Sequence, residues 1–203
     1  MKKQPKKKRL VLGITGTFGS GKTSVSRLFK SFGAKVIDAD KIARQILKPG
    51  ERIYKKLIKA FGKTIAKKGQ DIDRIKLAKV VFKDKKLLER LNKIMHPEII
   101  RIIKNQIKAS SDKPVVLDAP LLIEAGLRRS VDKLIVVKTK RKELLKRMLK
   151  NRSLNRIDTL KRINSQISLE DKVRLADFVI DNSGSIEQTK KQVKQIRRQL
   201  WKN

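Results

Sequence analysis

The stretch Gly16-Thr-Phe-Gly-Ser-Gly-Lys22-Thr23 decides the fold, because it matches G-x-x-x-x-G-K-[ST] at every specified position. A short apolar run, residues 10–15, precedes it, and a helical pattern follows it. In this strand–loop–helix setting the glycines let the backbone wind tightly, so that its N–H groups and the start of the helix face phosphate oxygens. The sequence therefore predicts a loop that binds a nucleoside triphosphate.

Two side chains of this loop carry the chemistry expected of a triphosphate site. Lys22 is expected to reach the β- and γ-phosphates, and the hydroxyl of Thr23 to ligate Mg²⁺. The guanine-binding tetrapeptide Asn-Lys-x-Asp is absent from the sequence. The motif therefore favours a kinase over a GTPase switch.

Four more short apolar runs follow the loop, and each is nearly continuous rather than alternating: residues 36–38, 114–118, 134–137 and 178–180. Such runs are typical of strands that are covered on both faces of a parallel sheet. Helical patterns lie between them, the first ending at Gly33. We therefore predict an α/β fold with a five-stranded parallel sheet and right-handed crossovers.

Two intervals interrupt the alternation of strands and helices. Residues 41–111 show only helical patterns, an interval far longer than one crossover needs, so we expect a helical insertion between the second and third strands. Residues 140–172 are basic, helical and poor in apolar side chains, which is typical of a surface flap. The expected organisation is one domain over residues 10–203, preceded by a basic tail over residues 1–9.

The helical patterns of the insertion are separated at three places, which we expect to be breaks between helices: Pro49-Gly50, residues 62–71 and His96-Pro97.

Composition excludes several classes of protein. The 203 residues carry 54 Lys and Arg against 19 Asp and Glu, a formal net charge of +35, and contain no Cys. The lack of cysteine excludes a disulfide scaffold, a zinc-thiolate site and a cysteine nucleophile, and it fits a reducing cytosol. Since no apolar run approaches the roughly 18 residues of a membrane span, we expect a soluble, cytoplasmic protein with no membrane partner.

The positive charge has two interpretations, a lysine-rich solvated surface or a dedicated nucleic-acid surface. Basic residues are spread along the whole chain, and one Trp, one Tyr and six Phe leave little for stacking on single strands. We therefore expect no specific nucleic-acid partner, only weak, salt-sensitive attraction.

A kinase also needs acids near the acceptor hydroxyl and the metal. Asp38 and Asp40 follow the second predicted strand, and Asp118 ends the third, at the edge where α/β sheets bind ligands. Each has a structural alternative: Asp40 as a helix N-cap and Asp118 as a turn residue.

Cations and a single histidine complete the candidate site. Arg147 and Arg152 lie in the basic flap, where they either neutralise a transferring phosphoryl group or remain solvated charges. His96 precedes Pro97 and either starts a helix, because proline is common at the first helical position, or contacts the acceptor.

Several separated motifs resemble those of the dephospho-CoA kinase family, over nearly the whole chain from residue 10 to about residue 200. Beyond the phosphate loop they are V-I-D-A-D-K-I-A-R at 36–44, H-P at 96–97, D-A-P-L-L-I-E at 118–124, R-I-x-x-Q at 162–166 and A-D-F-V-I-D-N at 176–182, with Arg147 and Arg152. The resemblance implies transfer of the γ-phosphoryl group of ATP to the ribose 3′-hydroxyl of dephospho-CoA, the last step of coenzyme A synthesis. It makes the helical insertion the acceptor-binding part and the flap a lid.

The resemblance also implies roles for single residues. Asp40 is expected beside the acceptor hydroxyl, Thr15 close to the reacting groups and Arg147 over the phosphates, where Lys22 completes the catalytic set. The expected ATP ligands are Gly16, Gly19, Ser20, Gly21, Lys22, Thr23, Ser24, Arg152 and Asn182, with Thr23 also binding Mg²⁺. The expected acceptor ligands are Asp38, Asp40, His96, Asp118 and Leu121.

Two other functions stay open at this point. One is a P-loop kinase for another small hydroxyl-bearing metabolite, and the other is a basic nucleic-acid-binding protein regulated by ATP. A monomer or a small homo-oligomer is expected.

Overall fold

The structure is a computed structural model, and it describes residues 9–67, 71–110, 113–150 and 166–201. The chain divides into two compact units, residues 1–37 with 107–203 and residues 38–106. The expected basic tail, apart from Arg9, and the middle of the expected lid lie outside the described residues. Among the described residues, no helix combines the length and the apolar character of a membrane span.

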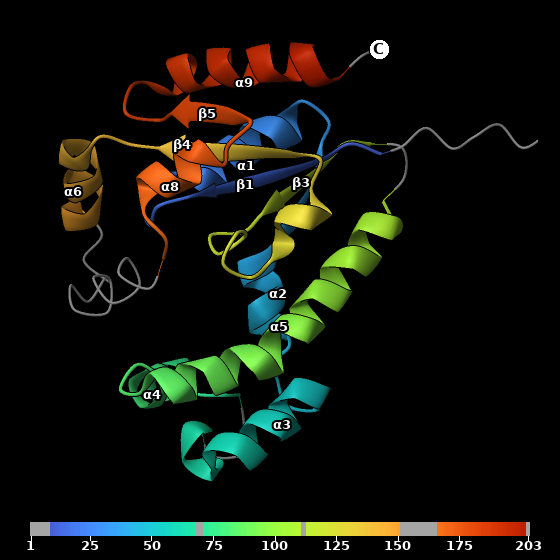
Figure 1. The fold of residues 1–203 in the computed structure, drawn as a ribbon, viewed down its shortest axis with the longest axis vertical. Helices are drawn as coiled ribbons and strands as arrows, with labels where there is room; N and C mark the ends of the chain where they lie inside the picture. The colour runs from blue at the N-terminus through green and yellow to red at the C-terminus, as the bar shows by residue number, and fades with distance from the viewer. Residues whose placement is uncertain (1–8, 68–70, 111–112, 151–165, 202–203) are drawn as a thin grey trace, which may run out of the picture. The chain divides into compact units, whose positions relative to one another are not determined.

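A five-stranded sheet forms the centre of the first unit, in the order β2-β3-β1-β4-β5 (Figure 1). Its central strand β1 pairs in parallel with β3 and β4, and β4 pairs in parallel with β5. The register sets Ile14 beside Asp118 and Gly16 beside Val137. The predicted parallel sheet is therefore confirmed, with strands β1 (Val11–Gly16), β2 (Lys35–Asp38), β3 (Val115–Asp118), β4 (Lys133–Lys138) and β5 (Phe178–Asp181).

Two helices, α1 (Lys22–Ser31) and α9 (Ile186–Leu200), pack against one face of this sheet. Gly33 follows α1 with a φ of 96°, in agreement with its predicted role as a stop. The buried core between helices and strands consists of Leu12, Ile14, Val25, Phe29, Ala34, Val116, Ile135, Val137, Ile180, Val193 and Ile196.

Shorter elements follow the central strands of the first unit. A 3-10 helix, η2 (Leu127–Ser130), lies between β3 and β4, and the loop that leads to it brings Leu122 against Gly13. A side chain at Gly13 would overlap Leu122, so the glycine allows this loop to approach β1 closely. The helices α6 (Arg141–Lys150) and α8 (Leu169–Arg174) come from the interval expected to be a lid.

The expectation that all five strands are covered on both faces is wrong for the two edge strands. β1 and β3 are buried throughout, whereas β2 is partly exposed and Val179 of β5 is 36% exposed. An apolar run shows that a segment is a strand, but its place in the sheet is set by pairing with distant segments.

The second unit is helical, as predicted, with one addition. The interval 62–71 contains a 3-10 helix, η1 (Lys63–Ile65), and Ala66 makes an antiparallel bridge with Ile72 just beyond it. Its buried apolar side chains include Ile42, Ile53, Leu57, Ile65, Ile72, Leu77 and Val81. The helices are α2 (Ala39–Gln45), α3 (Arg52–Phe61), α4 (Arg74–Val81) and α5 (Lys85–Lys108).

The predicted break at His96-Pro97 is wrong, because α5 continues through it. Proline lacks an N–H and crowds the preceding turn, which costs about 3 kcal/mol in a helix interior and usually kinks it. In Figure 1, α5 changes direction partway along its length. His96 is therefore a mid-helix residue rather than a helix start.

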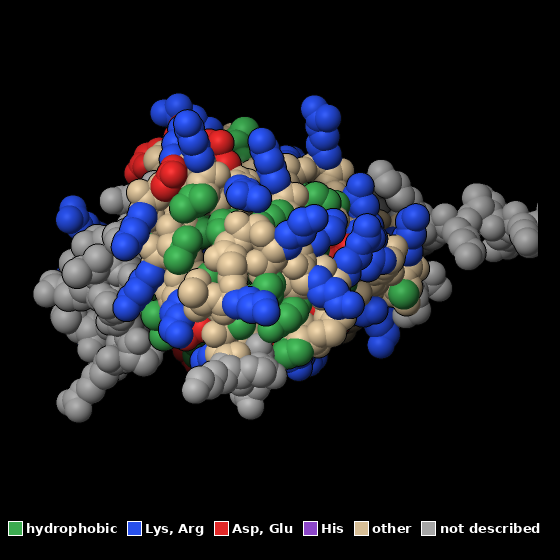
Figure 2. Space-filling model, turned by 90° about the horizontal axis from the view of Figure 1, so that it is seen from below, with side chains coloured by type: hydrophobic (Ala, Val, Ile, Leu, Met, Phe, Trp, Pro, Cys, Tyr) green, Lys and Arg blue, Asp and Glu red, His purple; other side chains and the backbone are tan. Residues whose placement is uncertain are grey.

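On the face seen in Figure 2, basic side chains are spread out rather than gathered at one place. Figure 2 shows Lys and Arg side chains scattered across one face, with apolar and backbone surface between them. This distribution agrees with a solvated lysine-rich surface.

Candidate active site

The phosphate loop connects β1 to α1, and its glycines permit two close backbone approaches. Gly16 has a φ of 151° and Gly21 a φ of 85°. A Cβ at Gly16 would overlap the carbonyl oxygen of Val137, and one at Gly21 would overlap the Asn182 amide. The loop therefore lies directly against β4 and against the residue that follows β5.

Buried hydrogen bonds fix the backbone of this loop at Ser20. The Ser20 carbonyl accepts from Thr139 Oγ1 at 3.0 Å and from Asn182 Nδ2 at 2.8 Å. The Asn182 Oδ1 atom in turn accepts from Thr189 Oγ1 at 2.9 Å. These three side chains are buried, so the loop is tied to segments more than one hundred residues away in sequence.

Lys22 lies across the loop that it belongs to. Its Nζ donates to the carbonyl of Gly16 at 3.2 Å and to that of Thr17 at 2.9 Å. α1 starts at Lys22, no described side chain caps it, and its first turn holds no acid. The positive end of this helix and the ammonium group thus act on the same small region, which is the arrangement that binds phosphate.

The predicted metal ligand and its neighbours differ in exposure. Thr23 is exposed and Ser24 half-buried, while the buried Ser20 Oγ has no hydrogen-bond partner among the described residues. No described group of three or more His, Asp or Glu side chains could hold a metal ion. Mg²⁺ commonly takes one or two protein ligands and completes its shell with water and phosphate oxygens, so a single Thr23 hydroxyl fits it.

Two predicted residues lie on the neighbouring central strands. Asp118 ends β3, is buried, and accepts from Ser26 Oγ of α1 at 2.7 Å. The alternative that Asp118 is a turn residue is therefore wrong. Thr15, fully buried directly before the loop, donates to the carbonyl of Pro120 at 2.9 Å, while Leu121 beyond it is 41% exposed.

Three predicted acceptor ligands belong to the second unit. Asp38 is the N-cap of α2, where its Oδ1 accepts from the Lys41 N–H at 2.9 Å. The alternative that Asp40 caps this helix is therefore wrong, since Asp40 lies in the first turn with an exposed side chain. His96 is half-buried, and burial lowers its pKa, so its imidazole is neutral near pH 7.

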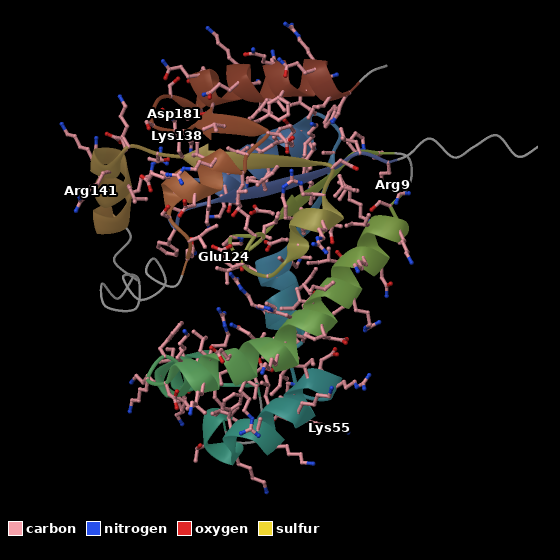
Figure 3. The ribbon with its side chains drawn as sticks, in the orientation of Figure 1. Arg9, Lys55, Glu124, Lys138, Arg141 and Asp181 are labelled. Carbon is pink, nitrogen blue, oxygen red and sulfur yellow. The ribbon has the colours of Figure 1, made fainter. Side chains whose placement is uncertain are left out.

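The first helix of the expected lid contacts the phosphate loop. Leu144 of α6 lies against Gly19. A Cβ added to Gly19 would lie 2.7 Å from the Cδ1 atom of Leu144. Arg147 is half-buried and donates to the Asn182 carbonyl at 2.7 Å. Figure 3 shows Arg141 on the same helix, with Lys138 and Asp181 at the ends of β4 and β5. Arg152 lies outside the described residues.

The first unit therefore gathers a phosphate loop, a buried acid and Arg147 of α6 at the carboxyl ends of its central strands. A family model described as Dephospho-CoA kinase matches residues 10–188. This chain belongs to the dephospho-CoA kinase family.

Relatives and solved structures agree with that membership. The dephospho-CoA kinase of Carboxydothermus hydrogenoformans is 46% identical over 195 residues, which cover 95% of this chain and 94% of the relative. The solved dephospho-CoA kinase of Campylobacter jejuni is 30% identical, with a TM-score of 0.68 over 94% of this chain and 96% of its own. A shikimate kinase from Bacteroides thetaiotaomicron, 12% identical with a TM-score of 0.54, covers 94% of this chain and 98% of its own, and shows the shared kinase fold alone.

The dephospho-CoA kinase resemblance and the kinase fold predicted from the sequence are thus confirmed. The two alternative functions, a kinase for another metabolite and a nucleic-acid-binding protein, are not favoured by these relatives. Four residues that support the site are not among those predicted from the sequence: Thr139 and Thr189, which help to fix the loop, and Glu124 and Lys172, which form an ion pair. Of these, only Glu124 had a signal, since it ends the motif at residues 118–124.

Proposed function

We propose that this chain phosphorylates the ribose 3′-hydroxyl of dephospho-CoA with ATP, in the cytoplasm. The observation that supports the proposal most strongly is the anchored phosphate loop, with Lys22 across it and Arg147 beside it, in a member of the dephospho-CoA kinase family. The relatives that carry this name match over nearly their whole length, which supports the same acceptor here.

The nucleotide is held by the loop and by the lid. The backbone N–H groups of Gly16, Gly19 and Gly21 surround the phosphates, together with the hydroxyls of Ser20 and Ser24. When ATP enters, Lys22 exchanges its two backbone carbonyls for oxygens of the β- and γ-phosphates, which hold far more negative charge.

The lid cations act on the transferring group. Arg147 and Arg152 neutralise charge on the γ-phosphoryl oxygens, and Asn182 orients the loop and the nucleotide. The hydroxyl of Thr23 would hold Mg²⁺, which would supply further positive charge to the phosphates when bound.

The acceptor hydroxyl attacks the γ-phosphorus in line with the leaving group. The new bond joins the 3′-oxygen to phosphorus, the bond from the γ-phosphorus to the bridging oxygen breaks, and ADP leaves with that electron pair. Asp40 takes the proton of the hydroxyl, late in a loose transition state, while Thr15 lies close to the reacting groups.

The second unit serves as the acceptor-binding part. Asp38 and His96 contribute there, and the neutral imidazole of His96 offers both a donor and an acceptor to the acceptor molecule. Asp118 and Leu121 of the first unit are further proposed acceptor ligands. The exposed side chain of Leu121 provides apolar surface for the adenine ring or the pantetheine arm.

Beyond its substrates, we expect the chain to have no specific nucleic-acid partner. We expect it to be a monomer or a small homo-oligomer. The net charge of +35 gives only a weak attraction to polyanions that decreases as salt rises.

The test is an ADP-release assay with dephospho-CoA, adenosine and RNA as separate acceptors. Turnover with dephospho-CoA alone is the expected result, and the product should carry a phosphate at the 3′-position by mass spectrometry and phosphorus NMR. ATP turnover stimulated by RNA or DNA without dephospho-CoA would refute the proposal in favour of a nucleic-acid-dependent activity.

A further inference from the structure

A lysine is buried beside the active site, where no role has been assigned to it. Lys172 of α8 is fully buried. Its ammonium group has three donors, and three oxygens surround it: Glu124 Oε1 at 3.0 Å, the Pro120 carbonyl at 3.1 Å and Gln166 Oε1 at 3.3 Å. The Lys172 charge therefore faces one carboxylate oxygen and two neutral oxygens, while Glu124 Oε2 is buried with no hydrogen-bond partner among the described residues.

Glu124 makes a second connection to the same segment. Its Oε1 also accepts from the backbone N–H of Ile167 at 3.2 Å. Figure 3 labels Glu124 on the loop that follows β3. The ion pair thus fixes α8 to that loop, and the backbone hydrogen bond fixes Ile167, shortly before α8, to the same carboxylate.

The Pro120 carbonyl carries the connection on to the phosphate loop. A carbonyl oxygen has two lone pairs, and this one accepts from Lys172 and from Thr15 Oγ1. Thr15 is fully buried and directly precedes Gly16, the first residue of the loop. A continuous path of hydrogen bonds thus runs from the segment before α8 to the start of the phosphate loop.

Stability alone does not explain such a pair. Removing two charges from water is expensive, and apolar residues of similar volume at such positions are often neutral or stabilising. What apolar side chains cannot supply is direction, because only an ammonium group with three donors holds a carbonyl, a carboxylate and an amide in one geometry.

We propose that Lys172 and Glu124 are positioning residues for phosphoryl transfer. They hold the segment before α8 against the loop after β3, and through the Pro120 carbonyl they set the position of Thr15 and of the first residue of the phosphate loop. This proposal rests on the proposed function, because the two residues are expected to affect the rate of phosphoryl transfer to dephospho-CoA.

The test compares a single and a double variant in stability and in turnover. Lys172→Met removes the charge and the three donors and leaves the Glu124 carboxylate unpaired, so it should lower both Tm and kcat. The double variant Lys172→Met with Glu124→Leu leaves no buried charge, so its Tm should return close to that of the wild type.

In the double variant, kcat should stay about 10²-fold below the wild type, because small displacements of reacting groups cost that much. The KM values for ATP and dephospho-CoA should change far less. Arg174→Met, on the exposed side of the same helix, is the matched control and should leave Tm and kcat unchanged. Recovery of kcat together with Tm in the double variant overturns the proposal.

A second variant decides the matter if the double variant does not fold. Glu124→Gln keeps the shape and an acceptor oxygen but removes the negative charge. A kcat per folded molecule below the wild type supports the positioning role, and a kcat in proportion to the folded fraction overturns it. Wild-type turnover is measured in parallel, to distinguish failure of the positioning proposal from failure of the proposed function. If the wild type does not turn over dephospho-CoA, the proposed function itself is refuted.

Discussion

Replacement of Asn182 by Ala tests whether the anchored loop backbone matters for ATP binding. The change removes the bond from Asn182 Nδ2 to the Ser20 carbonyl and the bond from Thr189 Oγ1 to Asn182 Oδ1. The Ser20 carbonyl and the Thr189 hydroxyl each keep another hydrogen bond, because Thr139 still donates to Ser20 and Thr189 still donates to the Ser185 carbonyl at 3.2 Å.

The magnitude follows from these two bonds. A typical intramolecular hydrogen bond contributes about 1 kcal/mol net, so the free energy of unfolding should fall by about 2 kcal/mol. For a chain of this size that is a decrease of about 4–8 °C in Tm. If most of this free energy is lost from ATP binding by the freed loop, the Kd for ATP rises about tenfold.

The assay combines thermal unfolding by circular dichroism with an ATP titration by calorimetry. Thr189→Val is the matched control, since it removes the two hydrogen bonds of Thr189 Oγ1, to Asn182 and to the Ser185 carbonyl, but leaves Asn182 bonded to Ser20. It should lower Tm by a similar amount and leave the Kd for ATP nearly unchanged. An Asn182→Ala variant that loses stability but binds ATP as tightly as the wild type would refute the argument that this anchor shapes the loop.

Three other variants test the remaining assignments. Lys22→Ala should nearly abolish phosphoryl transfer in the ADP-release assay while Tm stays close to the wild type, since the side chain is half-buried rather than part of the apolar core; retention of most of the rate contradicts the loop assignment. Asp40→Asn should lower kcat by about 10²- to 10⁴-fold with little change in ATP binding, whereas a normal kcat with a lower Tm indicates a structural role. Burial alone would raise the pKa of Asp177, but hydrogen bonds from the Leu134 N–H and Lys133 outweigh it and hold this pKa below its usual range. The carboxylate therefore stabilises the fold above about pH 4. In denaturant titrations, Asp177→Asn should be less stable than the wild type at pH 7, with the difference shrinking as pH falls below about 4; a constant difference contradicts this.

The sequence by itself determined the parts of this protein whose signals are local. The spacing of glycines, Lys22 and Thr23 after an apolar run requires a phosphate loop, because the backbone conformations and the charge lie within one continuous stretch. Five short apolar runs predicted the strands to within one or two residues for the same reason. Asp118 could be placed beside the loop because the carboxyl ends of parallel strands share one edge of the sheet.

Local signals were less reliable where the outcome depended on packing. Pro97 looked like a break between two helices, with the second helix starting there, yet α5 runs through it, since a lost hydrogen bond can be tolerated within a longer helix. The sequence offered Asp40 as a cap for the helix that follows β2, and only the backbone geometry assigned the cap to Asp38 instead.

Only the tertiary structure decided which polar residues support the loop. Lys172 is one of many basic residues in the sequence, and nothing near it in the chain distinguishes it from a solvated lysine. Its burial follows from three oxygens on Pro120, Glu124 and Gln166, two of them on a segment about fifty residues away. In the same way, Asn182 and Thr139 meet at the Ser20 carbonyl because β4, which pairs with β1, and β5, which pairs with β4, end at the same edge of the sheet. Hydrogen bonds between distant segments leave no periodic trace in a sequence, so they become visible only when the fold has brought their donors and acceptors together.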